Sequence, residues 1–181
     1  DDTEEIIFTV SQNISKAKID LATGMPAIEL LPVAKMKKAI VNATRNLQGG
    51  GLIYDKNGNQ NLKKQIAIRS LMWGGKLKEE DIITTSGSID AISFCMLSLV
   101  QKGDTIAVES PIYFGILHLA KSLGLNVLEL PTNPITGIEV DALKKALETK
   151  KVKLCLLVSN FSNPLGSCMP DENKKAVVAL M

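Results

Sequence analysis

The sequence predicts an α/β protein in which a mostly parallel sheet carries helices on both faces. Short apolar segments rich in β-branched residues recur along the second half of the chain. Segments of helix length separate them, and glycine or proline lies at most of the junctions. Parallel strands need long crossover connections, which helices usually supply. We therefore expect strands that are covered on both sides.

The first third of the chain predicts helices rather than strands. Residues 1–20 are mostly polar and weakly patterned, so we expect an N-terminal arm or linker there and one domain over residues 21–181. Leu31-Pro32 opens a helix that the glycines at 49–51 end. A second helix is expected from about Asn59 to Trp73, and its inward residues would be Leu62, Ile66 and Trp73.

Strands and helices then alternate. The predicted strands are residues 81–85, 105–109, 126–130 and 154–158, the last of them fully buried. The predicted helices are residues 91–100, a segment ending at 123, residues 140–149 and a last helix that starts after Gly166. This order indicates a sheet built by crossover connections.

Composition excludes several classes of protein. A net charge of +2 is too balanced to indicate nucleic-acid binding by itself. Three cysteines without CxxC spacing, two of them (Cys95 and Cys155) in apolar runs, favour buried free thiols in a reducing, cytoplasmic setting. The single histidine gives no support to a metal site. The acidic first residues and the short apolar runs predict neither a signal peptide nor a membrane span.

Ligands bind such sheets beyond the carboxyl ends of the strands, so the residues that follow each strand are site candidates. The first is Ser86-Gly87-Ser88. A glycine turn that enters a helix leaves backbone N–H groups unpaired, and these bind phosphate. The same residues are also ordinary helix caps, and the segment is neither a Walker motif nor a dinucleotide fingerprint. Phosphate binding is one of two interpretations here.

Two more segments follow later strands. Glu109-Ser110-Pro111-Ile112-Tyr113-Phe114-Gly115 holds two adjacent aromatic residues in a chain that is only 4% aromatic. They either face a ligand or pack under the next helix. Asn160–Gly166 contains Asn163-Pro164, a turn signal that needs no function, although an amide at this edge could both donate and accept hydrogen bonds.

Taken in order, these three segments resemble the class I/II aminotransferases, which have fold type I of the pyridoxal-phosphate enzymes. Thr85-Ser86-Gly87-Ser88 followed by Gly103 to Gly115 is most similar to the aminotransferase-like domain of GntR/MocR-type transcriptional regulators. Free-standing aminoadipate-type aminotransferases share the same sequence motifs. The resemblance runs from about Leu21 to the end of the chain and implies an incomplete large domain of this fold.

The resemblance implies a role for each matching residue. Gly87 and Ser88 would hold the phosphate of pyridoxal phosphate at the helix start. Tyr113 would stack on the pyridine ring, and Asn163 would hydrogen-bond its phenolic oxygen. These four residues are the predicted cofactor site within the strand-rich part of the chain.

Two further residues match the family nearer the amino terminus. Tyr54 matches a tyrosine that reaches the phosphate in the partner subunit, which implies a homodimer with shared sites. Gly24 matches a glycine near the carboxylate of the substrate, an amino acid or keto acid.

The sequence also departs from the family. Asp90 suits a helix start, but its charge is unfavourable near a phosphate unless it turns away. The Schiff-base lysine, the aspartate at the pyridine nitrogen and the carboxylate-binding arginine of the family would lie beyond Met181, so no catalytic residue is nominated. A phosphate at a helix start contributes about 0.3–2 kcal/mol, ring stacking about 0.5–1.5 kcal/mol and one hydrogen bond about 1 kcal/mol. Together these correspond to roughly a millimolar complex, so we expect this chain alone to bind pyridoxal phosphate weakly.

Two functions are compatible with this resemblance. We favour an effector-sensing domain of a transcriptional regulator, in which DNA is bound only through a domain absent from this chain. The alternative is a free-standing amino-acid aminotransferase. A Rossmann-like domain without a cofactor is a third interpretation.

Overall fold

The computed structural model describes residues 13, 18–19, 24, 26–47, 49, 52–53 and 57–181. The chain forms two compact units, residues 1–56 and 57–181. In the first unit, the 3-10 helix η2 (Ile28–Leu30) precedes α2 (Val33–Asn46), which confirms the first predicted helix. The apolar side chains of α2, Met36 and Ile40 among them, remain exposed. The expected arm at residues 1–20 stays a prediction.

The second unit begins with α3 (Gln60–Ser70), which continues into the 3-10 helix η4 (Leu71–Trp73). This confirms the second predicted helix but not its buried face. Leu62 and Trp73 are 49% and 62% exposed, whereas Ser70 is fully buried. The Ser70 hydroxyl accepts the N–H of Leu77 at 3.2 Å. α3 therefore buries the Ser70 hydroxyl, and this hydroxyl holds the chain that follows η4 through its bond to Leu77.

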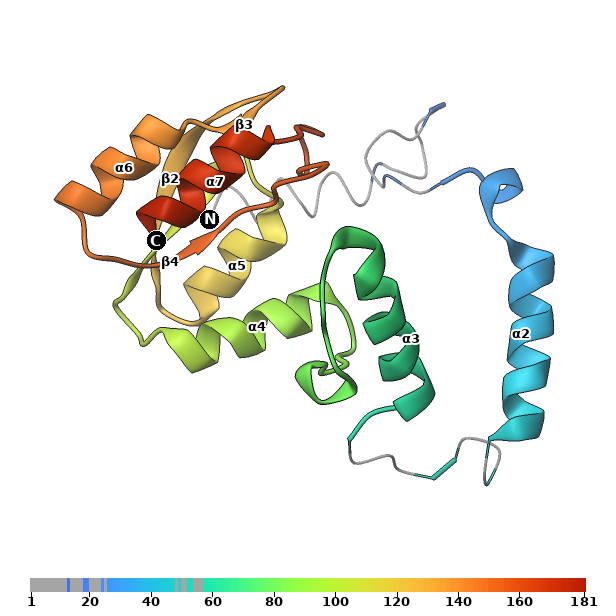
Figure 1. The fold of residues 1–181 in the computed structure, drawn as a ribbon. Coiled ribbons are helices and arrows are strands. Elements are labelled where there is room, and N and C mark those ends of the chain that lie inside the picture. The colour runs from blue at the N-terminus through green and yellow to red at the C-terminus, as the bar shows by residue number, and fades with distance from the viewer. Residues whose placement is uncertain are drawn as a thin grey trace. The chain divides into compact units, whose positions relative to one another are not determined.

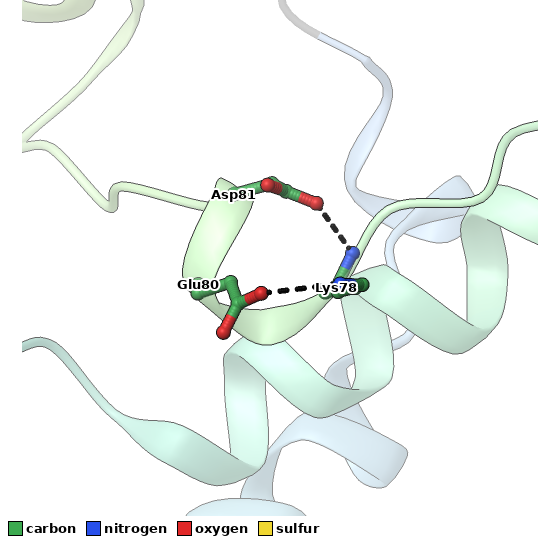
Figure 2. A network of polar contacts seen from close by, with 3 residues as sticks. All are labelled: Lys78, Glu80 and Asp81. Atoms are coloured by element: carbon green, nitrogen blue, oxygen red, sulfur yellow. Dashed lines mark hydrogen bonds and ion pairs between the residues drawn. The ribbon is translucent and has the colours of Figure 1, made fainter.

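The strand predicted at residues 81–85 is absent, which is a correction. The 3-10 helix η5 (Glu79–Asp81) occupies the start of this segment, and Asp81 Oδ2 accepts the N–H of Lys78 at 2.8 Å (Figure 2). Lys78 Nζ also lies 3.4 Å from Glu80 Oε1, in an exposed ion pair. β-branched residues favour an extended backbone, but a strand also needs a neighbour that pairs its N–H and C=O groups. Within the described residues, the sheet contains no such partner for this segment.

The sheet lies wholly in the second unit (Figure 1). Its order is β3-β2-β1-β4, and its strands are β1 (Thr105–Ser110), β2 (Asn126–Asn133), β3 (Gly137–Ile138) and β4 (Val152–Leu156). β1 is parallel to both β2 and β4, while the short β3 returns antiparallel to β2. The prediction of a mostly parallel sheet is confirmed. β3 was not predicted, because two residues carry no alternating pattern.

Helices cover both faces of this sheet, as predicted (Figure 1). They are α4 (Ser88–Leu99), α5 (Phe114–Ser122), α6 (Val140–Thr149) and α7 (Asp171–Leu180). Alternate residues of β1 point to opposite faces. Ile106 and Val108 join a core with Met96 of α4 and α5 residues. Ala107 joins a second core with α6 residues, with α7 packed against it.

Two burial predictions were wrong. Cys95 is exposed, because α4 turns only one face to the core and presents Cys95, Phe94 and Leu97 outward. β4 is only partly buried, since it is the edge strand of the described sheet. It also begins and ends two residues earlier than predicted.

Two features are absent from the described ranges. No helix among these residues is both long and apolar enough to cross a membrane. Nor do three or more histidine, cysteine, aspartate or glutamate side chains gather there in a way that could hold a metal ion.

Candidate functional site

The parallel sheet brings two of the predicted site segments to one edge. β1 and β4 are neighbours and run in the same direction, so their carboxyl ends share an edge of the sheet. Tyr113 follows β1 by three residues, and Asn163 follows β4 by seven. We call this edge, with residues 109–115 and 158–169, the carboxyl rim. Figure 1 shows α5 starting at the end of the sheet where the loop after β4 lies.

Tyr113 stands at the amino cap of α5 with its ring partly open to solvent. The residue is 38% exposed and Phe114 is 43% exposed, so neither ring is buried under the helix. Their centroids are 4.6 Å apart and tilted by 49°. The Tyr113 ring lies directly over Gly115, where an added Cβ would collide with ring carbon Cε1 and lie 3.0 Å from Cζ. A residue without a side chain at 115 therefore makes room for the ring.

The residues that end β1 form hydrogen bonds on both sides of the strand. The Ser110 N–H donates to Thr132 Oγ1 at 3.0 Å, and the Ser110 hydroxyl donates to the Glu129 carboxylate. Both partners belong to β2. On the other side, Glu109 Oε2 accepts the N–H of Val158, just beyond β4, at 2.9 Å. The start of the Tyr113 segment is thus fixed in two directions.

Glu109 is the buried carboxyl group of the rim. Only 2% of the residue is exposed, and Oε1 has no hydrogen-bond partner among the described residues. Burial raises the pKa of Glu109 above its ordinary value, while the hydrogen bond from Val158 acts in the opposite direction. Sequence reasoning quoted this glutamate within a motif but gave it no role.

The raised pKa gives Glu109 a defined effect on stability. The folded state holds the Glu109 proton more tightly than the unfolded chain does, so the stabilising contribution is complete below the ordinary carboxyl pKa. It is lost as pH rises through the raised pKa. Glu109→Gln keeps an oxygen for Val158 but cannot ionise. We expect this variant to gain stability relative to the wild type as pH rises above the ordinary carboxyl pKa of about 4, measured by urea unfolding. A difference that stays constant with pH would contradict this expectation.

The loop after β4 is held together by its own hydrogen bonds. Asn160 and Cys168 form an antiparallel bridge, and inside it the buried hydroxyls of Ser162 and Ser167 lie 2.6 Å apart. The Gly166 N–H donates to the Ser162 carbonyl across the turn. Asn163 lies exposed at this turn. The two serines were missed, because nothing in their spacing distinguishes them from ordinary loop residues.

Gly87 and Ser88 begin α4, on the face of the sheet that also carries α5. α4 ends at Leu99, shortly before β1 begins at Thr105. Its first residues are therefore at the end of the helix far from the amino end of β1. Gly87 has φ 150°, and no atom lies within 4 Å of where its Cβ would be. The helix start is therefore open to a ligand.

Asp90 lies close to this helix start. Its Oδ2 accepts the N–H of Ser86 at 3.1 Å, so the carboxylate is turned back toward the entering chain and already occupies one backbone donor. The Thr85 hydroxyl donates to the Gly87 carbonyl at 2.9 Å and steadies the same turn. An anion at this helix start would meet both favourable amides and one unfavourable charge.

Replacing Asp90 by asparagine tests that charge. The amide oxygen can still accept the Ser86 N–H, but the negative charge is gone. We expect the intact protein to bind pyridoxal phosphate about two- to fivefold more tightly, as judged by absorbance titration. Asp104→Asn is the matched control, because Asp104 also binds a backbone N–H, that of Gln101 at 2.9 Å, beyond the other end of α4. Equal effects of the two variants would argue against an anion at the start of α4.

The two remaining predicted residues belong to the first unit. Gly24 belongs to the first unit, where it is exposed with φ 60° and has open space around it. Tyr54 lies outside the described residues. The roles predicted for them, and the homodimer inferred from Tyr54, stay predictions.

Comparison with known proteins identifies the family. The model of the family "Aminotransferase class I and II" matches residues 16–181. This chain belongs to the class I and II aminotransferase family. The match extends into both compact units and includes every predicted site residue, so the resemblance found in the three loop segments extends over nearly the whole aminotransferase-like chain.

The relatives of this aminotransferase-like chain include both regulators and enzymes. The uncharacterized HTH-type transcriptional regulator YjiR of Escherichia coli K12 is 33% identical over 178 residues, which are 98% of this chain and 38% of the regulator. An alpha-aminoadipate aminotransferase, LysN of Thermus thermophilus, is 25% identical with a TM-score of 0.80. That structure holds N-(5'-phosphopyridoxyl)-L-leucine, and the match covers 94% of this chain and 43% of LysN.

A third similarity concerns the fold alone. An archaeal alanine:glyoxylate aminotransferase has a TM-score of 0.84 at 24% identity, over 98% of this chain and 45% of that enzyme. The chain thus has the fold of pyridoxal-phosphate-dependent aminotransferases, as predicted. It spans less than half the length of each of these three proteins.

Proposed function

We propose that residues 21–181 are the front part of a pyridoxal-phosphate-binding domain that senses an effector in a GntR/MocR-type transcriptional regulator. The observation that carries this proposal is the similarity to an HTH-type regulator over 98% of the chain. The carboxyl rim supports it, because an aromatic ring and an amide side chain follow neighbouring parallel strands at one edge. Residues 1–20 would then be the arm that leads into this domain.

The residues of the second unit fit the cofactor chemically. The open helix start at Gly87 and Ser88 offers backbone N–H groups and a hydroxyl to the phosphate. The exposed face of Tyr113 suits stacking on a pyridine ring, and the Asn163 amide suits its phenolic oxygen. When bound, pyridoxal phosphate acts as an electron sink for reactions at the α-carbon of an amino acid. The part of this chain is to hold and orient that ring.

In this proposal the effector is an amino acid, a keto acid or an adduct of an amino acid with the cofactor. The phosphopyridoxyl-leucine in the LysN structure supports a ligand of this class. DNA binding would belong to a domain outside residues 1–181, and the protein would act as a homodimer in the cytoplasm. Gly24 would lie near the effector carboxylate, and Tyr54 would reach the partner subunit's cofactor.

A free-standing aminotransferase is the second candidate, favoured by the similarity to LysN over 94% of the chain. The two candidates differ in what the intact protein does. A regulator should bind the DNA upstream of its own gene with an affinity that an amino acid changes. An enzyme should instead transfer amino groups to keto acids without binding DNA.

The shared step, cofactor binding, is tested first. Titrating the intact protein with pyridoxal phosphate should give a saturable absorbance change, and Asn163→Ala should weaken the binding about fivefold through loss of one hydrogen bond. Lys153→Ala, on the exposed side of β4, is the control and should have no effect. A wild-type protein whose spectrum does not change with pyridoxal phosphate would overturn the proposal.

A further inference from the structure

Glu109 connects two segments that lie 49 residues apart in the sequence. It is the penultimate residue of β1, an interior strand of the described sheet, and its carboxylate accepts the N–H of Val158. Val158 lies two residues beyond the end of β4, where the chain leaves the sheet. The bond is 2.9 Å long, and the glutamate is almost completely buried, so water does not compete strongly for it.

Residues 158–169 are held together by hydrogen bonds among themselves. These bonds join Asn160 to Cys168, Ser162 to Ser167, and Met169 to Ser159. The carboxyl-terminal end of this segment is fixed to the turn between β2 and β3 (residues 134–136), since the Cys168 N–H donates to the Ile135 carbonyl at 3.1 Å, and Met169 is buried in the core. Its amino-terminal end is fixed to the sheet, because the Val158 N–H donates to the Glu109 carboxylate. A change at Glu109 should therefore loosen the whole segment from the sheet rather than one residue of it.

We propose that Glu109 is a positioning residue, which holds the 158–169 segment against β1 and thereby sets where the Asn163 amide meets a bound ligand. This inference rests on the proposed function of Asn163. The backbone path is short, because Asn163 is five residues from Val158 within the same braced loop. Ser110, the next residue, fixes the Tyr113 side to β2, so adjacent residues of one strand hold both ligand-facing segments in register.

Two variants separate the hydrogen bond from the charge. Glu109→Ala removes the acceptor of the Val158 N–H, whereas Glu109→Gln keeps an oxygen of the same shape at that place. In the intact protein we expect Glu109→Ala to weaken pyridoxal-phosphate binding about tenfold, and Glu109→Gln to stay within about twofold of the wild type. Glu139→Ala, an exposed glutamate whose side chain forms no capping bond, is the control and should leave binding unchanged.

A double-mutant cycle asks whether Glu109 acts through Asn163. If it does, Glu109→Ala should have little further effect on affinity in a protein that already carries Asn163→Ala. Equal effects in both backgrounds, or a Glu109→Gln variant as weak as Glu109→Ala, would overturn the positioning role. Those outcomes would mean that the glutamate supports the fold in general or acts through its charge.

A readout without cofactor keeps this inference distinct from the proposed function. Hydrogen exchange of the unliganded protein should become faster in residues 158–169 for Glu109→Ala, but not for Glu109→Gln, while β1 and α6 stay protected. Unchanged exchange in residues 158–169 would overturn the inference. If the wild type binds no pyridoxal phosphate, the proposed function fails, and the exchange pattern alone decides whether Glu109 holds the segment.

Discussion

Replacing Met96 by alanine is expected to lower the free energy of unfolding by about 2–5 kcal/mol. Met96 is fully buried, and it packs in the core that joins α4 and α5 to Ile106 and Val108 of β1. Truncation removes apolar contacts and leaves a cavity that the surrounding strand and helices cannot fill completely. Urea unfolding followed by circular dichroism measures the change.

Met72→Ala is the matched control for that substitution. Met72 lies in η4 of the same unit and is 86% exposed, so its removal should change the unfolding free energy by less than about 0.5 kcal/mol. Similar losses in the two variants would mean that the core around Met96 is not what stabilises the second unit. It would also weaken the argument that α4 holds Gly87 and Ser88 in place.

Gly115→Ala is expected to reduce the affinity of the intact protein for pyridoxal phosphate about tenfold, through loss of ring stacking and orientation. A methyl group at 115 would overlap the Tyr113 ring. Since Tyr113 is 38% exposed, the ring can turn away into solvent instead of disrupting the fold. Alanine also favours a helix over glycine by about 1 kcal/mol. The variant should therefore remain folded, and the loss should be seen in absorbance titration rather than in unfolding.

The control for Gly115→Ala is the same change in a Tyr113→Ala background. Without the ring there is nothing for the new methyl group to displace, so the second substitution should change the affinity by less than about twofold. If Gly115→Ala weakens binding equally with and without the ring, the effect would come from the backbone of α5. That result would contradict the proposal that the Tyr113 ring stacks on pyridoxal phosphate.

The regular part of the fold was predictable because burial leaves a periodic trace in the sequence. Residues 106–108 of β1, covered on both sides, show it as a short apolar run, and α6 shows it as an amphipathic helix with the predicted bounds. Residues 81–85 show a β-branched run without a partner strand. Local composition reports the preference for an extended backbone, whereas pairing depends on residues far away in the sequence. The same limit explains why β3 was missed.

The candidate site was predictable to a different extent. Tyr113 and Asn163 could be placed at one rim, because parallel strands align their carboxyl ends and the residues after them follow from the strand positions. Residues that act through distant hydrogen bonds left no such signal. The bond from Val158 to Glu109 spans 49 residues, and the buried contact between Ser162 and Ser167 requires the closed loop to exist first. Such pairs emerge only from the folded chain.

The hairpin tip between β2 and β3 also constrains how this part of the molecule can vary. Asn133 Oδ1 accepts the N–H groups of Ile135 and Thr136, and the Ile135 carbonyl in turn receives Cys168. An added or deleted residue in the turn would shift that carbonyl and carry the 158–169 segment with it. Insertions and deletions among related chains should therefore be rare at 133–136, and more frequent where α6 meets β4 at the opposite edge.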